Sequence, residues 1–315
     1  MKNDYKYMVF TKCLTFNQAQ YIEQTLNGFA MQDTRYSIVF CIIDDASTDG
    51  EQDVIRKWAE TNLCLCDSGE NTWNKKDFGL QLVAHHKEKG NLIFNIILLA
   101  ENHHGKKSKI PYYIELRNNS RYNAICEGDD YWDHPLKIQT QVEFLENHPE
   151  CSMCFHAHHS LQPDGSLVER KPETDKDIFY PEDIIDKAGG FMATNSMLFR
   201  SEYLINENIP DFWKHSLVGD LPRMLFLITK GNFGYINKFM SVYRVMAKGS
   251  WSERDNKASV SQLIKKLKHN MLMYKEFDLY TEGKYSTLIE KRVKRNKQVF
   301  YIRIVKTIFR SIINH

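Results

Sequence analysis

The sequence has none of the features of an exported or membrane-spanning chain. Its first ten residues, MKNDYKYMVF, contain no apolar stretch of the roughly seven to fifteen residues found in signal peptides. The longest apolar run, residues 92–100, is interrupted by Asn95 and falls short of the roughly 20 residues of a spanning helix. The seven cysteines are odd in number and follow no disulfide spacing. We therefore expect a reduced, cytoplasmic chain with only peripheral membrane contact.

Glycine-rich phosphate-binding motifs are missing too. No GxxxxGK[ST] pattern occurs, which argues against a P-loop nucleotide-binding protein. Residues 11–20, TKCLTFNQAQ, contain no glycine, which argues against a sugar-nucleotide nucleotidyltransferase. The formal net charge is only +2, so a protein that mainly coats nucleic acid is excluded as well.

Length and composition indicate a globular chain with a basic end. The 315 residues are 42% hydrophobic, enough for a large core without disulfides. Residues 1–254 carry 28 basic and 35 acidic side chains, whereas residues 255–315 carry 14 and 5. We predict a main domain over 1–254, with halves at about 1–133 and 134–254, and a basic helical C-terminal extension over 255–315.

Strand-like and helix-like segments alternate, which predicts an α/β fold with a mostly parallel central sheet flanked by helices. The first half predicts strands at 7–14, 36–43, 94–100 and 121–126, and helices at 18–31, 52–60, 108–118 and 135–147. Residues 62–92 look polar and irregular. The second half predicts strands at 152–161, 195–199 and 240–245 and helices at 181–187 and 220–230, as a mixed sheet that continues the same domain.

Two acidic pairs follow predicted strands directly. They are Asp44 with Asp45, and Asp129 with Asp130. Because ligands bind outside the carboxyl ends of parallel strands, we expect both pairs at one rim of the sheet. Adjacent carboxylates suit Mg²⁺ or Mn²⁺, which also binds phosphates and water. Taken alone, such a pair is more typical of turn and helix-capping residues than of a metal site.

Four segments together resemble inverting family 2 glycosyltransferases of the GT-A fold, of the type that builds bacterial surface polysaccharides. These segments are CLTFN at 13–17 followed by Tyr21 and Ile22, IDDASTDG at 43–50, CEGDDYW at 126–132 with PLK at 135–137, and GDLP at 219–222 followed by MSVYRV at 240–245. Their order and spacing are more specific than any one motif.

The resemblance implies a binding site for a nucleotide-sugar donor, with UDP as the expected nucleotide, near the early segments. Thr15 and Asn17 lie in the loop where the nucleotide is first contacted. Asp45 corresponds to the residue that contacts the uracil ring, although helix capping remains an alternative role. Asp129 corresponds to the residue that faces the ribose, and Asp130 to the ligand of Mn²⁺ or Mg²⁺.

Asp220 corresponds to the family's general base, which removes the proton of the acceptor hydroxyl. Its local sequence also fits the start of a helix that runs to residue 230. We expect Asp220→Asn to fold and to lose transfer activity.

The chain departs from the family pattern at Met246. Many relatives have a histidine two residues after the arginine of this strand, and a thioether is a poor ligand for Mn²⁺ or Mg²⁺. Either Asp130 and solvent hold the ion, or Arg244 or Lys248 neutralises the phosphates, or the chain is weakly active. The loop containing Trp251 could also close over the donor sugar, with surface packing as the alternative.

A CxxC motif at 151–154 and histidines at 156, 158 and 159 suggest zinc only superficially. Alternation along a strand places Cys151 and Cys154 on opposite faces, so the preferred interpretation is a strand in the core. The alternative interpretation is that His156 or His158 faces a cleft for the acceptor. The loop at 103–107 (HHGKK) is interpreted as exposed.

The C-terminal segment 299–313 predicts an amphipathic helix preceded by a basic run. We expect residues 284–315 either to contact an anionic membrane or to pack on the domain or on a second subunit.

The function implied by the resemblance is metal-dependent, inverting transfer of a sugar to a hydroxyl of a glycan or polyprenyl-linked saccharide at the inner face of the membrane. The alternative is a non-catalytic relative that binds glycans as an assembly module.

Overall fold

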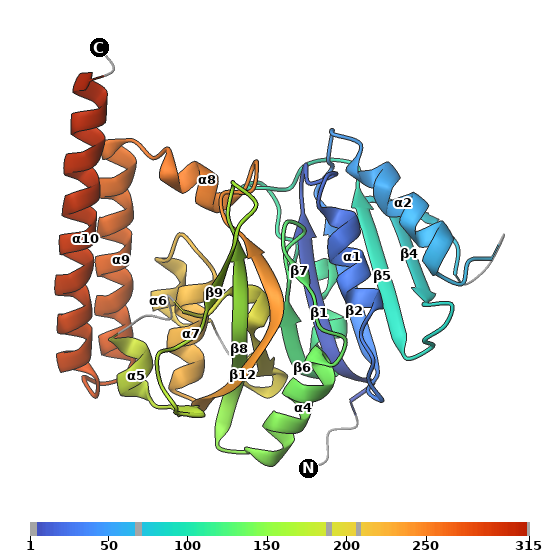
Figure 1. The fold of residues 1–315 in the computed structure, drawn as a ribbon, viewed down its shortest axis with the longest axis horizontal. Helices are drawn as coiled ribbons and strands as arrows, with labels where there is room; N and C mark the ends of the chain where they lie inside the picture. Colours follow the sequence, from blue (N-terminus) through green and yellow to red (C-terminus); the bar gives the residue numbers. More distant parts are fainter. Residues whose placement is uncertain (1–4, 67–70, 187–190, 206–208, 314–315) are drawn as a thin grey trace.

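The computed structural model describes residues 5–66, 71–186, 191–205 and 209–313. Over these residues twelve strands form one mixed sheet (Figure 1). The strand order is β10 (Ile178–Phe179), β12 (Asn232–Arg244), β8 (Cys151–Leu161), β11 (Leu198–Arg200), β6 (Ser120–Ile125), β1 (Tyr7–Thr15), β2 (Ile38–Asp44), β5 (Leu92–Leu99), β4 (Gly79–His85) and β3 (Asn74–Lys76). In addition, β7 (Tyr131–Trp132) pairs with β12 and β9 (Leu167–Arg170) pairs with β8.

The centre of the sheet is parallel, and helices flank it as expected. Strands β6, β1, β2 and β5 run parallel to one another, so their carboxyl ends share one edge. The helices are α1 (Ile22–Ala30), α2 (Glu51–Asn62), α3 (Ile114–Asn118), α4 (Lys137–Asn147), α5 (Pro181–Ile185), α6 (Asp211–Lys214), α7 (Asp220–Ile228), α8 (Trp251–Asn256), α9 (Val260–Tyr280) and α10 (Ser286–Ile313). This arrangement confirms the α/β fold class with a C-terminal helical extension.

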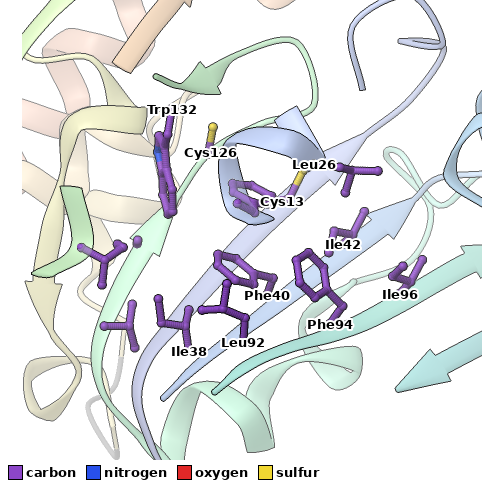
Figure 2. Packing of buried hydrophobic residues seen from close by; sticks show 14 of the residues in the cluster. Cys13, Leu26, Ile38, Phe40, Ile42, Leu92, Phe94, Ile96, Cys126 and Trp132 are labelled. Carbon is purple, nitrogen blue, oxygen red and sulfur yellow. The ribbon is translucent and has the colours of Figure 1, made fainter. Parts of the chain in front are cut away.

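Alternate side chains of β2 pack into two hydrophobic cores, one on each face of the sheet. Ile38, Phe40 and Ile42 point to the face covered by α1 (Figure 2). There Phe40 stacks on Phe29 of α1, with ring centroids 4.8 Å apart. Val39, Cys41 and Ile43 point to the other face, beneath the segment that contains α3. All seven residues of β2 are buried, as a continuous apolar run predicts for a strand covered on both sides.

A close approach between α1 and β7 requires glycine at position 28. A Cβ on Gly28 would lie 2.6 Å from the carbonyl oxygen of Trp132. The fully buried Trp132 in turn packs edge-on against Phe29. This contact fixes the turn between β6 and β7, which carries Asp129 and Asp130, relative to the first helix.

The C-terminal helices form an antiparallel hairpin at one end of the sheet (Figure 1). Helix α9 packs on α6, and α10 packs on α9 and α5. Tyr274 and Phe277 of α9 are fully buried in the core of the second half. The last turns of α10 reach beyond the start of α9 (Figure 1). No helix in the described ranges has both the length and the hydropathy to cross a bilayer.

Several local predictions were wrong. Residues 62–92 are not irregular throughout, because β3 and β4 add an antiparallel edge to β5. The helix expected at 108–118 is a 3₁₀ turn, Ile110–Tyr112, followed by the five-residue α3. The strand expected at 195–199 begins only at Leu198, after a 3₁₀ turn. Pro135 precedes α4 instead of occupying its first turn, since that helix begins at Lys137. The prediction for 181–187 extends to Lys187, which lies outside the described residues.

Candidate active site at the carboxyl ends of the strands

The loops after β1 and β2 are joined by one buried carboxylate, that of Glu51. It accepts hydrogen bonds from the Thr15 hydroxyl, from the backbone N–H of Gln18 at 2.8 Å and from the Ser47 hydroxyl at 2.8 Å. Burial raises the pKa of Glu51, and these hydrogen bonds oppose that shift. Glu51 was not predicted from the sequence, where the available signal was an acidic residue directly after Gly50, at the first position of a helix.

Asn17 makes a second connection between the same loops. Its backbone has φ +55°, in the left-handed region that asparagine tolerates. The Asn17 N–H donates to the Ser47 hydroxyl at 2.8 Å, and the Asn17 side-chain oxygen accepts from the Thr48 N–H at 2.8 Å. Thr15, the last residue of β1, and Asn17, in the loop that follows, are therefore both held against the end of β2.

Asp45 is buried beyond the end of β2, and residues of the loop after β5 orient it. Its Oδ1 accepts the His103 backbone N–H at 2.8 Å, and its Oδ2 lies 2.8 Å from Lys109 Nζ. Neither carboxylate oxygen caps α2; Asp49 accepts the Glu51 N–H instead. The capping alternative for Asp45 was thus wrong, and its partner Lys109 was not foreseen.

Asp129 and Asp130 form the turn between β6 and β7. Glycine at 128 is needed there, because a Cβ would lie 2.1 Å from the Thr15 hydroxyl oxygen. Asp130 is only 4% exposed, and its Oδ1 accepts the backbone N–H of Arg244 at 2.8 Å. Burial, followed by the charge of Asp129, raises the pKa of Asp130 well above its ordinary value. Burial, followed by the charge of Glu127, raises the pKa of Asp129 to about 6.

Two adjacent carboxylates with raised pKa values fit a divalent cation, because a nearby positive charge stabilises their ionised forms. Their oxygens match the preference of Mg²⁺ and Mn²⁺. Within the described ranges, no set of three or more His, Cys, Asp or Glu side chains is placed to hold a metal ion. An ion here would therefore need oxygen ligands from a bound diphosphate and water.

Arg244 is held between two tyrosine rings. Its guanidinium carbon lies 4.7 Å from the ring centroids of both Tyr21 and Tyr131. The guanidinium donates to the carbonyl oxygen of Asp129 and to the side chain of Gln24. Lys248, by contrast, is exposed in the turn after β12, where its carbonyl oxygen accepts from Gln18 Nε2 at 3.4 Å.

Asp220 is the first residue of α7 and is half-buried. Its Oδ2 lies 3.5 Å from the hydroxyl of Thr194. One phenol relates it to the acidic pair: burial raises the pKa of Tyr243, and the charges of Asp130, Asp129 and Asp220 add to that shift. The three carboxylates thus lie within electrostatic reach of the same side chain.

Met246 begins the segment that leads from β12 to α8. Its backbone has φ +56°, and its N–H donates to the hydroxyl of Ser252 at 3.1 Å. Trp251 is the first residue of α8 and is 49% exposed. The lid role of Trp251 stays a prediction.

The histidine-rich strand β8 lies in the core. Cys154 and His156 are fully buried, and Cys154 Sγ contacts the side chain of Gln141. Burial lowers the pKa of His158 to about 4, so its imidazole is neutral at pH 7. The loop residue His103, expected to be exposed, is also buried, beneath Tyr112.

Taken together, the parallel strand ends and the acidic rim are those of a GT-A glycosyltransferase, and comparisons with known proteins agree. The family model "Glycosyl transferase family 2" matches residues 14–204. Because the match covers more than half of the chain, the chain belongs to this family.

Similar curated proteins are uncharacterized proteins of Mycobacterium tuberculosis and Mycobacterium bovis. Each is 28% identical over 246 residues, which cover 76% of this chain. The chain spans 59% of the length of these relatives.

Two solved structures share the fold. Staphylococcus aureus TarS 1–349 in complex with UDP-GlcNAc has a TM-score of 0.54 at 13% identity, covering 94% of this chain and 79% of that one. The mannosyltransferase PcManGT from Pyrobaculum calidifontis, in complex with GDP-Man and Mn²⁺, has a TM-score of 0.53 at 15% identity, covering 92% and 70%.

Proposed function

We propose that this glycosyltransferase moves one sugar from a UDP-linked donor to a hydroxyl of a glycan or lipid-linked oligosaccharide, with inversion at the anomeric carbon. The product would be a bacterial surface polysaccharide. The observation that carries the proposal is the buried turn after β6, where Asp130 accepts the backbone N–H of Arg244 at 2.8 Å and the Arg244 guanidinium donates to the carbonyl oxygen of Asp129.

The donor side would be built from the loops after β1, β2 and β6. Asp45, held by Lys109 and the His103 N–H, would accept from the uracil ring. Asp129 would accept from the ribose. Thr15 and Asn17, fixed through Glu51 and Ser47, would shape the floor beneath the nucleotide.

Asp130 would hold Mn²⁺ or Mg²⁺ together with the donor's diphosphate. When bound, such an ion offsets the negative charge that develops on a departing nucleoside diphosphate. Arg244 would position Asp130 through its backbone N–H and Asp129 through its guanidinium. Lys248, exposed in the turn after β12, would help to neutralise the phosphates.

Asp220 would remove the proton from the acceptor hydroxyl as that oxygen attacks the anomeric carbon from the face opposite the diphosphate. Its half-buried position at the start of α7 leaves the carboxylate accessible. A positioned base of this kind contributes about 10² to 10⁴ in rate.

The acceptor would be presented at the cytoplasmic face of the cell membrane, with the C-terminal hairpin as the peripheral contact. Helix α10 exposes Val299, Tyr301, Ile302 and Phe309 in its second half, together with Lys297 and Lys306. Exposed apolar side chains beside lysines suit an anionic lipid surface.

The test is a screen for slow donor hydrolysis with UDP-, GDP- and dTDP-sugars in the presence of Mn²⁺, combined with calorimetric titration of UDP. We expect hydrolysis of a UDP-sugar and Mn²⁺-dependent binding of UDP that Asp130→Ala abolishes. The matched control is Asp164→Ala in the exposed turn between β8 and β9. If UDP binds without metal dependence and no donor is hydrolysed, the alternative of a non-catalytic assembly module is favoured. Met246 supports that alternative, because a thioether is a poor ligand for Mn²⁺ or Mg²⁺.

A further inference from the structure

A groove of about 250 Å³ lies between α8 and the first half of α9. It lies outside the acidic rim and has a different chemistry. Its lining includes one aromatic ring, three cations, one carboxylate and an apolar side chain: Trp251, Arg254, Lys265, Lys266, Asp255 and Leu217.

The groove is positively charged. Its carboxylate, Asp255, is already bonded by two cations, Lys266 and Arg303, the latter at 2.9 Å. The side chain of Asp255 is only 14% exposed, so it is screened from a ligand by its own partners. Lys265 is exposed on α9 and adds a further positive charge, as does Arg254. Three cations and one already paired carboxylate in the lining favour an anionic ligand.

An aromatic face lies beside these cations. Trp251 is 49% exposed, and Lys266 Nζ lies 5.3 Å from its ring centroid. An exposed indole offers a flat apolar surface to the face of a sugar ring, whereas lysine and arginine donate to phosphate oxygens. This combination fits a ligand that carries a sugar and a phosphate together.

The groove adjoins the candidate active site through three connections. Leu217, in its lining, precedes Asp220 by three residues. Ser252, next to Trp251, accepts the backbone N–H of Met246, two residues after Arg244, at 3.1 Å. Arg254 donates to the carbonyl oxygen of Gly249 at 2.6 Å, in the turn after β12 that also contains Lys248.

We propose that this groove binds the phosphate of a phosphorylated sugar acceptor, with Trp251 against the sugar and Lys265 and Arg254 on the phosphate, so that an acceptor hydroxyl reaches Asp220. The inference rests on the proposed function and names the class of acceptor: a saccharide with a phosphate close to the hydroxyl that receives the new sugar.

Binding of glucose 1-phosphate tests the groove, measured by calorimetry at low salt with saturating UDP and Mn²⁺ to fill the donor side. Glucose serves as the uncharged comparison. Lys265→Glu should weaken binding of glucose 1-phosphate about tenfold, since it replaces a charge-assisted hydrogen bond with repulsion. Trp251→Ala should weaken binding of the same ligand. The control Lys268→Glu changes an exposed lysine of α9 outside the groove and should leave binding unchanged.

Two results would overturn the proposal. One is equal binding of glucose 1-phosphate by the wild type, Lys265→Glu and Trp251→Ala. The other is that Lys265→Glu reduces only co-sedimentation with vesicles containing 30% phosphatidylglycerol, which would assign these cations to lipid headgroups. Donor hydrolysis by the wild type is measured in parallel. Binding of glucose 1-phosphate without hydrolysis rejects the proposed function alone, whereas hydrolysis without binding rejects the groove alone.

Discussion

The backbone N–H of Arg244 donates to the carboxylate of Asp130 at 2.8 Å, across 114 positions of sequence. This bond ties the last residue of β12 to the turn after β6, and therefore ties the second half of the sheet to the acidic rim of the first. The Arg244 side chain strengthens the connection by donating to the carbonyl oxygen of Asp129 from between two tyrosine rings.

Arg244→Lys is expected to lower the free energy of unfolding by about 1 to 3 kcal/mol, because an ammonium cannot stack between two rings while donating in two directions. Urea denaturation measures the loss. Arg35→Lys, at a side chain that is 71% exposed, is the control and should change stability by less than about 0.5 kcal/mol. Equal stability of the two variants would contradict the bridging role.

Asp220→Asn is expected to reduce sugar transfer by about 10² to 10⁴, because an amide cannot accept the proton of the acceptor hydroxyl. Its loss of stability should stay near 1 kcal/mol or below, the usual range for an acid in the first turn of a helix. Transfer rate and thermal unfolding are measured together, with Asp211→Asn at the exposed start of α6 as the control. Turnover of Asp220→Asn within a few-fold of the wild type would remove the base assignment.

Mn²⁺ affinity should depend on pH through Asp129. Its carboxylate neighbours Asp130, the proposed ligand of the ion, and its negative charge attracts the cation, so affinity should fall as the pH drops through about 6, the pKa to which burial and Glu127 raise this residue. Calorimetry with UDP present measures it, and Asp129→Asn should flatten the profile near pH 6. A profile that is already flat in the wild type would count against Asp129.

Glu51→Ala should lower the free energy of unfolding by about 2 to 4 kcal/mol, because three donors lose their buried acceptor. UDP should also bind more weakly, since the loops that contain Asn17 and Ser47 lose their common anchor. Glu60→Ala, exposed at the other end of α2, is the control. If UDP binding is unchanged while stability falls, Glu51 serves the fold alone.

Lys137→Met should stabilise the protein at neutral pH by about 1 to 3 kcal/mol. Burial lowers the pKa of Lys137 to about 7 from an ordinary value of 10.5. The folded state therefore loses stability as the pH falls from about 10.5 to 7, where only the unfolded chain gains the proton. The gain from Lys137→Met should shrink toward pH 10.5 in urea denaturation.

The control for that substitution is Lys57→Met on the exposed face of α2. If Lys137→Met instead destabilises the protein equally at both pH values, the bond from Lys137 to Gln141 and the contact with the Trp132 ring outweigh the cost of burial.

The partners of the site residues could not be predicted from the sequence. Asp45 was identified from its motif, but its ion pair with Lys109 depends on the loop after β5, where the expected helix breaks at Tyr113.

The strand β4 was missed because only Leu82 and Ala84 of its seven residues are buried, which is the weak pattern of a strand near a sheet edge.

The chain's own order of apolar and polar residues determined the parallel centre of the sheet and the placement of acidic pairs after β2 and β6. Those features are local, because burial on both faces demands a continuous apolar strand, and a turn demands polar residues at its end. Only the tertiary structure decided that β12 returns beside β8, so that Arg244 meets Asp130, and that α8 packs near α9 to form a basic groove. Such contacts join segments far apart in sequence, and their energy depends on packing and burial that no single segment contains.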